Sequence, residues 1–271
     1  MKRQHDAGAT SSSNARAPAR YNFNSNVRMS LIRTLRQWAP VSLGIVVLAT
    51  AICPSRAFPQ DSAARAGEPA RREDFKLGDE NREADQRATD LLKAMGARTE
   101  IGLPTVGAGN GYYSMRLSEI VGAEGKVFAE DISTYSIDGL DRRVKAFDLP
   151  NVEIVKGEVD NPKLPSESIA AVLIVDSYHH FTQYQSMLGQ VLHALKPGGR
   201  LVIADYSLPA HRTQSRADQL KIHEIDPELA RAECAQAGFQ VLRCDDPFVK
   251  HVKTGRIGLV DLFVMVAVRP E

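Results

Sequence analysis

Cysteine is scarce in this chain of 271 residues, which contains only Cys53, Cys234 and Cys244. Two cysteines in the body of the chain are too few for a framework of disulfide bonds. Cys234 falls in a helical pattern and Cys244 in a strand pattern, so we interpret both as partly buried thiols. The sequence spacing brings no other metal-binding side chain close to them, and we expect no metal site.

An excess of charge of either sign is also lacking, because the net charge of the whole chain is +1. The charge is unevenly distributed: residues 1–57 carry +7, which leaves −6 on residues 58–271. Proteins that bind nucleic acids usually present a basic face, so the acidic body argues against that class. The 43% of hydrophobic and 25% of charged residues are typical of a globular protein.

Long hydrophobic runs are missing, apart from one uncharged stretch between Gln37 and Ser55 that follows two arginines. This stretch barely reaches the ~20 residues that a membrane span needs. Small residues at Ser55 and Ala57 suit a signal peptidase, so residues 1–57 are predicted to be a leader that is cleaved after Ala57. The alternative is an uncleaved membrane anchor over residues 37–57. We therefore expect an exported (periplasmic) or membrane-anchored protein, or a cytoplasmic one if the leader is not used.

The composition changes after the leader. Residues 58–81 mix alanine, arginine, glutamate, glycine and proline without a period, and we predict a flexible linker there. From residue 101 to 206, strand patterns then alternate with helical ones. The predicted strands cover residues 101–106, 126–129, 151–156, 169–175 and 200–204. This alternation indicates an α/β fold, in which right-handed crossovers build a parallel sheet with helices on both faces.

A glycine-rich stretch organises this pattern. Gly107, Gly109 and Gly111 occupy alternate positions between the first predicted strand and a helix. Glycine allows positive φ and lets the backbone approach a ligand closely, and such a loop directs the free N–H groups of the helix at that ligand. A dinucleotide-binding fingerprint has the spacing G-x-G-x-x-G, so the third glycine comes one residue early here.

Polar residues follow each of the other predicted parallel strands. Asp131 ends the second strand, 24 residues after Gly107, which is where a carboxylate accepts hydrogen bonds from a ribose. Because the carboxyl ends of parallel strands meet at one edge, where ligands bind, we expect these residues to share one site. The later strands are followed by Glu158, Asp176, His179, His180 and Asp205.

Taken together, residues 82–271 resemble the class I S-adenosylmethionine (SAM) dependent methyltransferases. The motifs that carry the resemblance are Val106–Tyr113, Gly125–Ile132, Asn151–Glu153 with Gly157, Val175–Phe181, Leu195–Arg200 and Ala237–Phe239. The Tyr-His-His-Phe segment at 178–181 is similar to that of a bacterial subgroup that often carries leaders. The resemblance implies a Rossmann-like, doubly wound, mostly parallel seven-stranded sheet with an antiparallel last strand.

The resemblance also implies SAM as the cofactor and assigns roles to residues. Three glycines hold the methionine end, Asp131 binds the ribose, two residues flank the adenine, and Asp176 faces donor and acceptor. The glycines are Gly107, Gly109 and Gly111, and the adenine neighbours are Glu158 and Val159. If the acceptor must lose a proton, His179 or His180 could act as the base. The alternative for at least one histidine is a structural hydrogen bond at the sheet edge.

Two departures from the family's pattern leave other functions open. Thr105 replaces the family's usual carboxylate, and Pro104 stands in a strand, where it removes an amide. A degenerate SAM-binding or ligand-free exported module is therefore one alternative, and an NAD-dependent oxidoreductase is the second. The acceptor is expected to be a small molecule or lipid-like, with no nucleic acid as partner and with membrane association through the leader. An insertion that we expect either to cap the acceptor pocket or to form a solvated loop contains His211, Arg212, Arg216, Lys221 and His223.

Overall fold

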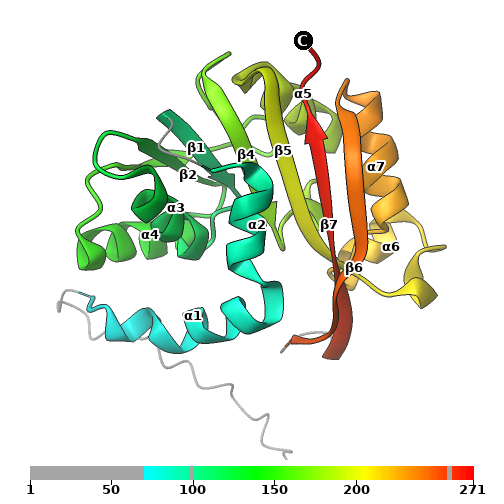
Figure 1. Ribbon diagram of the computed structural model, residues 1–271. Helices are drawn as coiled ribbons and strands as arrows, with labels where there is room; N and C mark the ends of the chain where they lie inside the picture. Colours follow the sequence, from blue (N-terminus) through cyan, green and yellow to red (C-terminus); the bar gives the residue numbers. More distant parts are fainter. Residues whose placement is uncertain (1–69, 98–100, 255–257) are drawn as a thin grey trace, which may run out of the picture. The chain divides into compact units, whose positions relative to one another are not determined.

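The computed structural model describes residues 70–97, 101–254 and 258–271, which form one seven-stranded sheet with helices on both faces (Figure 1). The strand order is β3-β2-β1-β4-β5-β7-β6. Strands β1 to β5 pair in parallel, and β7 is antiparallel to both β5 and β6. The strands are β1 Ile101–Val106, β2 Lys126–Asp131, β3 Val152–Lys156, β4 Ile169–Val175, β5 Leu195–Ser207, β6 Gln240–Thr254 and β7 Gly258–Val268. The predicted fold class is confirmed.

The helices divide the core into two layers, one on each side of the sheet. One layer holds the buried faces of α2 (Ala88–Met95), α3 (Tyr112–Val121) and α4 (Thr134–Phe147). The other holds those of α5 (Tyr184–Ala194) and α7 (Pro227–Gln236). Figure 1 shows β4 and β5 between these layers, and all residues of β4 except the half-buried Ala170 are buried. In a strand that is covered on both faces, apolar and polar residues do not need to alternate. The sequence of β4 is therefore a continuous apolar run.

Helix ends follow the local sequence. Gly96 ends α2 with φ +69° and donates its backbone N–H to the carbonyl oxygens of Leu92 and Lys93, as glycine does after the last turn of many helices. Asp226 begins α7, because its side chain accepts the backbone N–H of Glu228 at 3.1 Å. Both ends are therefore marked by residue types that favour them, glycine after a last turn and aspartate before a first turn.

The linker expected at residues 58–81 is corrected over residues 73–81, because these residues belong to helix α1, Glu73–Gln86. This helix lacks an apolar stripe, and contacts with distant parts of the chain hold it. The Arg143 guanidinium, 1% exposed, donates to both carboxylate oxygens of Asp79 at 3.0 and 2.9 Å and lies over the Phe75 ring. Breaking such a buried pair costs about 3–5 kcal/mol. Local sequence cannot reveal a partner 64 positions away.

The predicted leader at residues 1–57 lies outside the described residues, as does the linker up to residue 69. Among the described helices, none is long and apolar enough to cross a membrane.

Candidate functional site

The glycine loop adopts the conformation that its sequence requires, and each glycine has a different reason for lacking a side chain. Gly107 (φ +72°) would place a Cβ 1.8 Å from the Ser177 Oγ, so it allows close approach of the loop that follows β4. Gly111 (φ +85°) would place one 2.7 Å from Leu140 on α4. Only Gly109 (φ +57°) faces open space, with no atom within 4 Å of an added Cβ. Gly109 is therefore where a ligand can approach the backbone.

Asp131 fixes this loop from the tip of β2. Its Oδ2 accepts the backbone N–H of Gly109 at 2.9 Å, and its Oδ1 accepts that of Ser133 at 2.8 Å. The side chain is 8% exposed and lies on the wall of a cavity. The predicted ribose-binding carboxylate is thus beside the glycine loop.

The neighbouring Glu130 was missed by the sequence analysis. Its side chain is 1% exposed, and its Oε2 accepts the backbone N–H of Gly107 at 3.2 Å. Burial, assisted by the nearby charge of Asp131, raises the pKa of Glu130 to about 8, against the opposing effects of the Gly107 hydrogen bond and Lys156. This carboxyl is therefore mostly protonated at pH 7. Its only signal in the sequence is its position one residue before Asp131.

A cavity of about 480 Å³, here called the carboxyl-end cavity, opens beyond the carboxyl ends of β1, β2 and β4. At its wall, Ile132 and Val159 are 49% and 52% exposed although both are apolar. Asp176 adopts φ +51°, a strained conformation for a residue with a side chain. The predicted site residues on its wall are Gly107, Gly109, Asp131, Val159, Asp176 and His180, joined by Glu130, Ser177 and Phe181.

A second cavity of about 160 Å³, here called the loop cavity, shares Gly107, Gly109 and Asp176 with the first. Arg82 from α1 also lines it, as does Thr105. The Thr105 hydroxyl is 2.7 Å from that of Ser114, and Thr105 is 3% exposed. Arg82 was not predicted as a site residue, because no local pattern indicates that α1 reaches the site.

The two predicted catalytic histidines occupy different environments although they are adjacent in the 3-10 turn Tyr178–His180. His179 is 1% exposed, and its Nδ1 lies 2.9 Å from the Asp205 Oδ1, while its backbone N–H donates to the Asp205 Oδ2 at 3.0 Å. His180 is exposed and lines the carboxyl-end cavity. His179 therefore matches the structural alternative, and His180 can reach a ligand.

Two predicted cofactor residues lie away from these cavity walls. Gly111 packs against α4, and the exposed Glu158 forms an ion pair with Lys163. In the predicted capping insertion, Arg212 pairs with Asp246 at 2.7 and 2.8 Å. Further ion pairs there join Arg216 to Glu233 and Lys221 to Asp218, and the Nδ1 of His211 lies 3.0 Å from the Glu224 Oε1. Within the insertion, His223 lies against the rings of His179 and His180.

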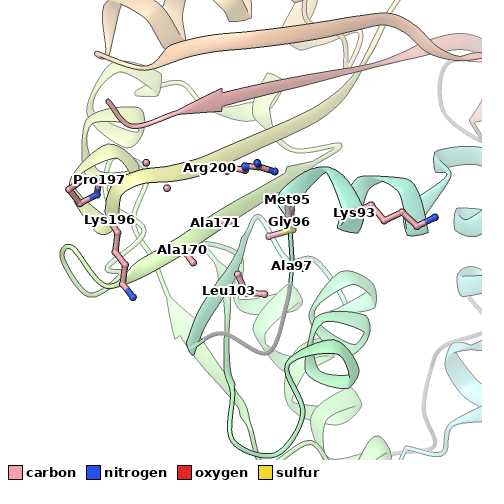
Figure 2. Close-up of a pocket in the computed structure, with 12 residues that line it drawn as sticks. Lys93, Met95, Gly96, Ala97, Leu103, Ala170, Ala171, Lys196, Pro197 and Arg200 are labelled. Atoms are coloured by element: carbon pink, nitrogen blue, oxygen red, sulfur yellow. The ribbon is translucent and has the colours of Figure 1, made fainter. Parts of the chain in front are cut away.

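A third cavity, of about 640 Å³, lies at the opposite edge of the sheet, between α2 and the amino ends of β4 and β5 (Figure 2). We call it the amino-end cavity. Its wall carries three cations, Lys93, Lys196 and Arg200. Figure 2 shows that Lys93 and Lys196 extend away from one another, and Lys93 forms an ion pair with Asp90 at 3.5 Å. These charges do not converge on one point.

Comparisons with known proteins find relatives of the central part of the chain. Residues 105–199 match the family model described as a methyltransferase domain. The chain is 28% identical over 127 residues to the ubiquinone/menaquinone biosynthesis C-methyltransferase of Pseudomonas syringae pv. syringae, and equally to that of Pseudomonas putida strain GB-1. Each match covers 46% of this chain and 50% of the relative, so the chain spans about half the length of these curated relatives.

Solved structures share the fold. An SAM-dependent methyltransferase from Aquifex aeolicus superposes with a TM-score of 0.58 at 23% identity, covering 71% of this chain and 95% of that chain. A geranyl diphosphate C-methyltransferase from Streptomyces coelicolor, complexed with S-adenosyl-L-homocysteine, superposes with a TM-score of 0.56 at 18% identity. The match covers 75% of this chain and 86% of that chain. The sheet therefore has the fold of these methyltransferases, and residues 105–199 match the model of a methyltransferase domain.

Proposed function

We propose, on the premise that residues 105–199 are a methyltransferase domain, that this protein transfers a methyl group from SAM to a small-molecule or lipid-like acceptor. One observation carries the proposal. Gly109 presents an open backbone face to a cavity, and the carboxylate at the tip of the next strand holds its amide. This geometry suits a nucleoside that lies along the loop with its ribose toward Asp131.

The residues around the loop fit both ends of SAM. The carboxyl-end cavity, at about 480 Å³, falls within the roughly 300–1,000 Å³ of small-molecule sites. Ile132 and Val159 offer apolar surfaces to the adenine ring. In the loop cavity, the Arg82 guanidinium suits the carboxylate of the methionine end. Because Gly107 and Gly109 line both cavities, one ligand can extend across the loop.

SAM supplies a methyl group on a sulfonium, and the neutral thioether leaves without help from an acid. The main contribution of the protein is then to hold the acceptor in line with the methyl group. Asp176, Ser177 and His180 line the carboxyl-end cavity beside the loop and would position the acceptor. Phe181 and Met187 add apolar surface to the same wall, which suits a lipid-like or aromatic acceptor. The similarity to ubiquinone/menaquinone biosynthesis C-methyltransferases supports that class.

Calorimetric titration of the full chain with SAM, S-adenosylhomocysteine and NAD tests the cofactor. We expect the first two to bind, and tighter binding of NAD would favour the oxidoreductase. Gly109→Ala should weaken SAM at least about tenfold, since its methyl group would enter the ligand's space. Gly122→Ala is the matched control, because Gly122 has φ +68° and open space around it but lies at the end of α3. Equal effects of both variants, or no binding of SAM, would contradict the proposal and favour a degenerate module.

We also propose that the leader directs export, based on the uncharged stretch and the small residues before the predicted cleavage after Ala57. N-terminal sequencing of the protein from separated cell fractions tests this. The expected product begins at Phe58 in the periplasmic fraction, or retains residues 37–57 in the membrane fraction. A soluble cytoplasmic product that begins at Met1 or Met29 would be the contrary result.

A further inference from the structure

We propose that His179, His180 and His223 bind one divalent transition-metal ion, of the zinc class, at the edge of the carboxyl-end cavity. One nitrogen from each imidazole lies within 4.8 Å of those of the other two. Three neutral imidazoles with a fourth, open position are a ligand set of catalytic zinc sites. This proposal departs from the sequence-based expectation that the protein has no metal site.

The three rings come from two separate segments that the fold brings together. His179 and His180 follow β4, and His223 follows helix α6 (Arg216–Lys221). The ring centroids of His223 are 5.5 Å from His179 and 5.2 Å from His180. Zn–N bonds of 2.0–2.1 Å require tetrahedral ligand nitrogens to be about 3.4 Å apart. Small rotations of the exposed His180 ring and the half-buried His223 ring can provide this closure.

Asp205 gives His179 the surroundings of a metal ligand. It is fully buried, and besides the Nδ1 and backbone N–H of His179 it accepts the backbone N–H of Tyr206 at 2.8 Å. Because Nδ1 faces this carboxylate, Nε2 is the ring nitrogen through which His179 would contact a metal. Metal-binding histidines commonly donate their second N–H to a carboxylate in this way, which orients the ring.

The backbone around the cluster is strained as expected at a functional site. His223 has φ +58° and Asp176 has φ +51°, conformations that are uncommon for residues with side chains and persist where the surrounding structure enforces them. A carboxylate oxygen of Asp176 also lies within 4.8 Å of a His179 nitrogen. Asp176 belongs to a second group of possible ligand atoms, which includes neither His180 nor His223, so it is a neighbour of the proposed ion and not one of its ligands.

The position of the cluster suggests what the open coordination position would bind. His180 and Asp176 both line the carboxyl-end cavity next to Gly107, so this position faces the space assigned to the acceptor. An acceptor hydroxyl bound there would have its pKa lowered by the metal. Its proton would leave to solvent, and its oxygen would keep the electron pair that attacks the methyl group. This role rests on the proposed function, in which His180 then acts as a ligand and not as a base; the metal binding itself does not.

The test uses the full chain, purified without a polyhistidine tag and stripped of metal with a chelator. Titration with Co²⁺ is followed by visible absorption, and Zn²⁺ affinity is measured by competition with a chelating dye. We expect one Co²⁺ per chain, with the intense bands of a four-coordinate ion, and displacement by one Zn²⁺. Wild-type protein that takes up no more metal than the double variant His180→Ala/His223→Gly would overturn the proposal.

Single variants locate the ion. His180→Ala and His223→Gly should each weaken Zn²⁺ at least about tenfold, and glycine suits the φ of +58° at position 223. The matched controls are His193→Ala, an exposed histidine on α5, and His251→Gly, an exposed histidine with φ +55° on β6. Both controls should bind Zn²⁺ like the wild type, and equal losses in controls and cluster variants would mean adventitious binding.

Two further measurements separate folding and cofactor effects from metal binding. Thermal unfolding of the metal-free variants shows whether they fold, and added Zn²⁺ should raise the Tm of the wild type but not of the double variant. S-adenosylhomocysteine is titrated into the same samples. If it binds and Zn²⁺ does not, only this inference fails. If Zn²⁺ binds and S-adenosylhomocysteine does not, the methyltransferase proposal fails and the metal site stands.

Discussion

The carboxyl-end and amino-end cavities lie at opposite edges of one sheet. The amino-end cavity is the larger, but the polar groups on its wall are less fixed and less convergent. The amino-end cavity has a volume of about 640 Å³ against about 480 Å³. Its cations are exposed, and two of them extend apart (Figure 2). At the carboxyl end, a carboxylate orients backbone amides, glycines hold positive φ, and two carboxyl groups are buried. Volume alone therefore does not identify a binding site, whereas convergent and fixed polar groups do.

The largest expected difference between the two ends is in how they respond to pH. With its pKa raised from 4.5 to about 8, Glu130 binds a proton in the folded state that the unfolded chain has already lost. Its contribution to stability is complete below pH 4.5 and is lost as pH rises to about 8, by an amount on the order of a few kcal/mol. Urea denaturation across this range should show the decline.

Glu130→Gln should flatten this pH dependence, because the amide cannot ionise. The matched control is Glu124→Gln, an exposed glutamate between α3 and β2, which should leave the decline unchanged. A decline that is the same in wild type and Glu130→Gln would show that Glu130 is ionised at neutral pH. The cations of the amino-end cavity are exposed, so they should contribute little over the same range.

Removing one charge at each end sharpens the comparison through cofactor affinity. Asp131→Ala should weaken SAM by ~1–3 kcal/mol, since charge-assisted hydrogen bonds to the ribose are lost and the Gly109 amide is released. Lys196→Ala, in the amino-end cavity, should leave the affinity unchanged. Calorimetry on both variants provides the measurement. If Lys196→Ala weakened SAM binding as much as Asp131→Ala, the cofactor would not be confined to the carboxyl-end cavity, which would contradict the proposal.

Arg82 should contribute a smaller share, about tenfold in SAM affinity, through the carboxylate of the methionine end. Methylthioadenosine, which lacks that end, should bind Arg82→Gln and wild type equally well. Arg200→Gln removes the matching guanidinium from the amino-end cavity and should affect neither ligand. If Arg82→Gln weakens both ligands equally, the guanidinium acts through the fold and not through the carboxylate.

The smallest effect expected is a gain. Thr105 supplies only a neutral hydroxyl to the loop cavity, and a carboxylate there would form charged hydrogen bonds, which are stronger than neutral ones by ~1 kcal/mol. Thr105→Asp should therefore improve SAM affinity about tenfold or somewhat less. Thr105→Val, which loses the contact with Ser114 without adding charge, is the control and should bring no gain. Weaker binding by Thr105→Asp would show that the hydroxyl pair is already suited to the ligand.

The sequence predicted elements well where the local pattern decides the structure. The strand at 169–175 was predicted with the bounds of β4, because burial on both faces leaves a continuous apolar run. The start of helix α4 at Thr134 has a weaker pattern, since its first turn depends on the Ser133 cap and carries the exposed Tyr135. Helix α1 was missed because its contacts are long-range.

The same division holds for the site. Gly107, Gly109, Asp131 and Asp176 could be placed together because parallel strands bring their carboxyl ends to one edge. The different surroundings of His179 and His180 could not be predicted, since a 3-10 turn directs adjacent side chains differently and the hydrogen bonds of His179 go to Asp205 on another strand. Sequence spacing also gave no reason to join His223 to this pair.

The position of β7 inside the sheet has a consequence for the order in which the chain folds. Strand β7 lies between β5 and β6 and pairs with β5 from Ser207 to Arg200. During synthesis, β5 therefore waits with an unpaired edge until residue 268 has been made, long after β5 itself has emerged. An apolar strand edge that stays open is a template for wrong pairing, and a contact between segments far apart in sequence forms slowly. The nascent chain thus passes through a period in which it depends on protection from aggregation, and this period ends only when β7 is inserted.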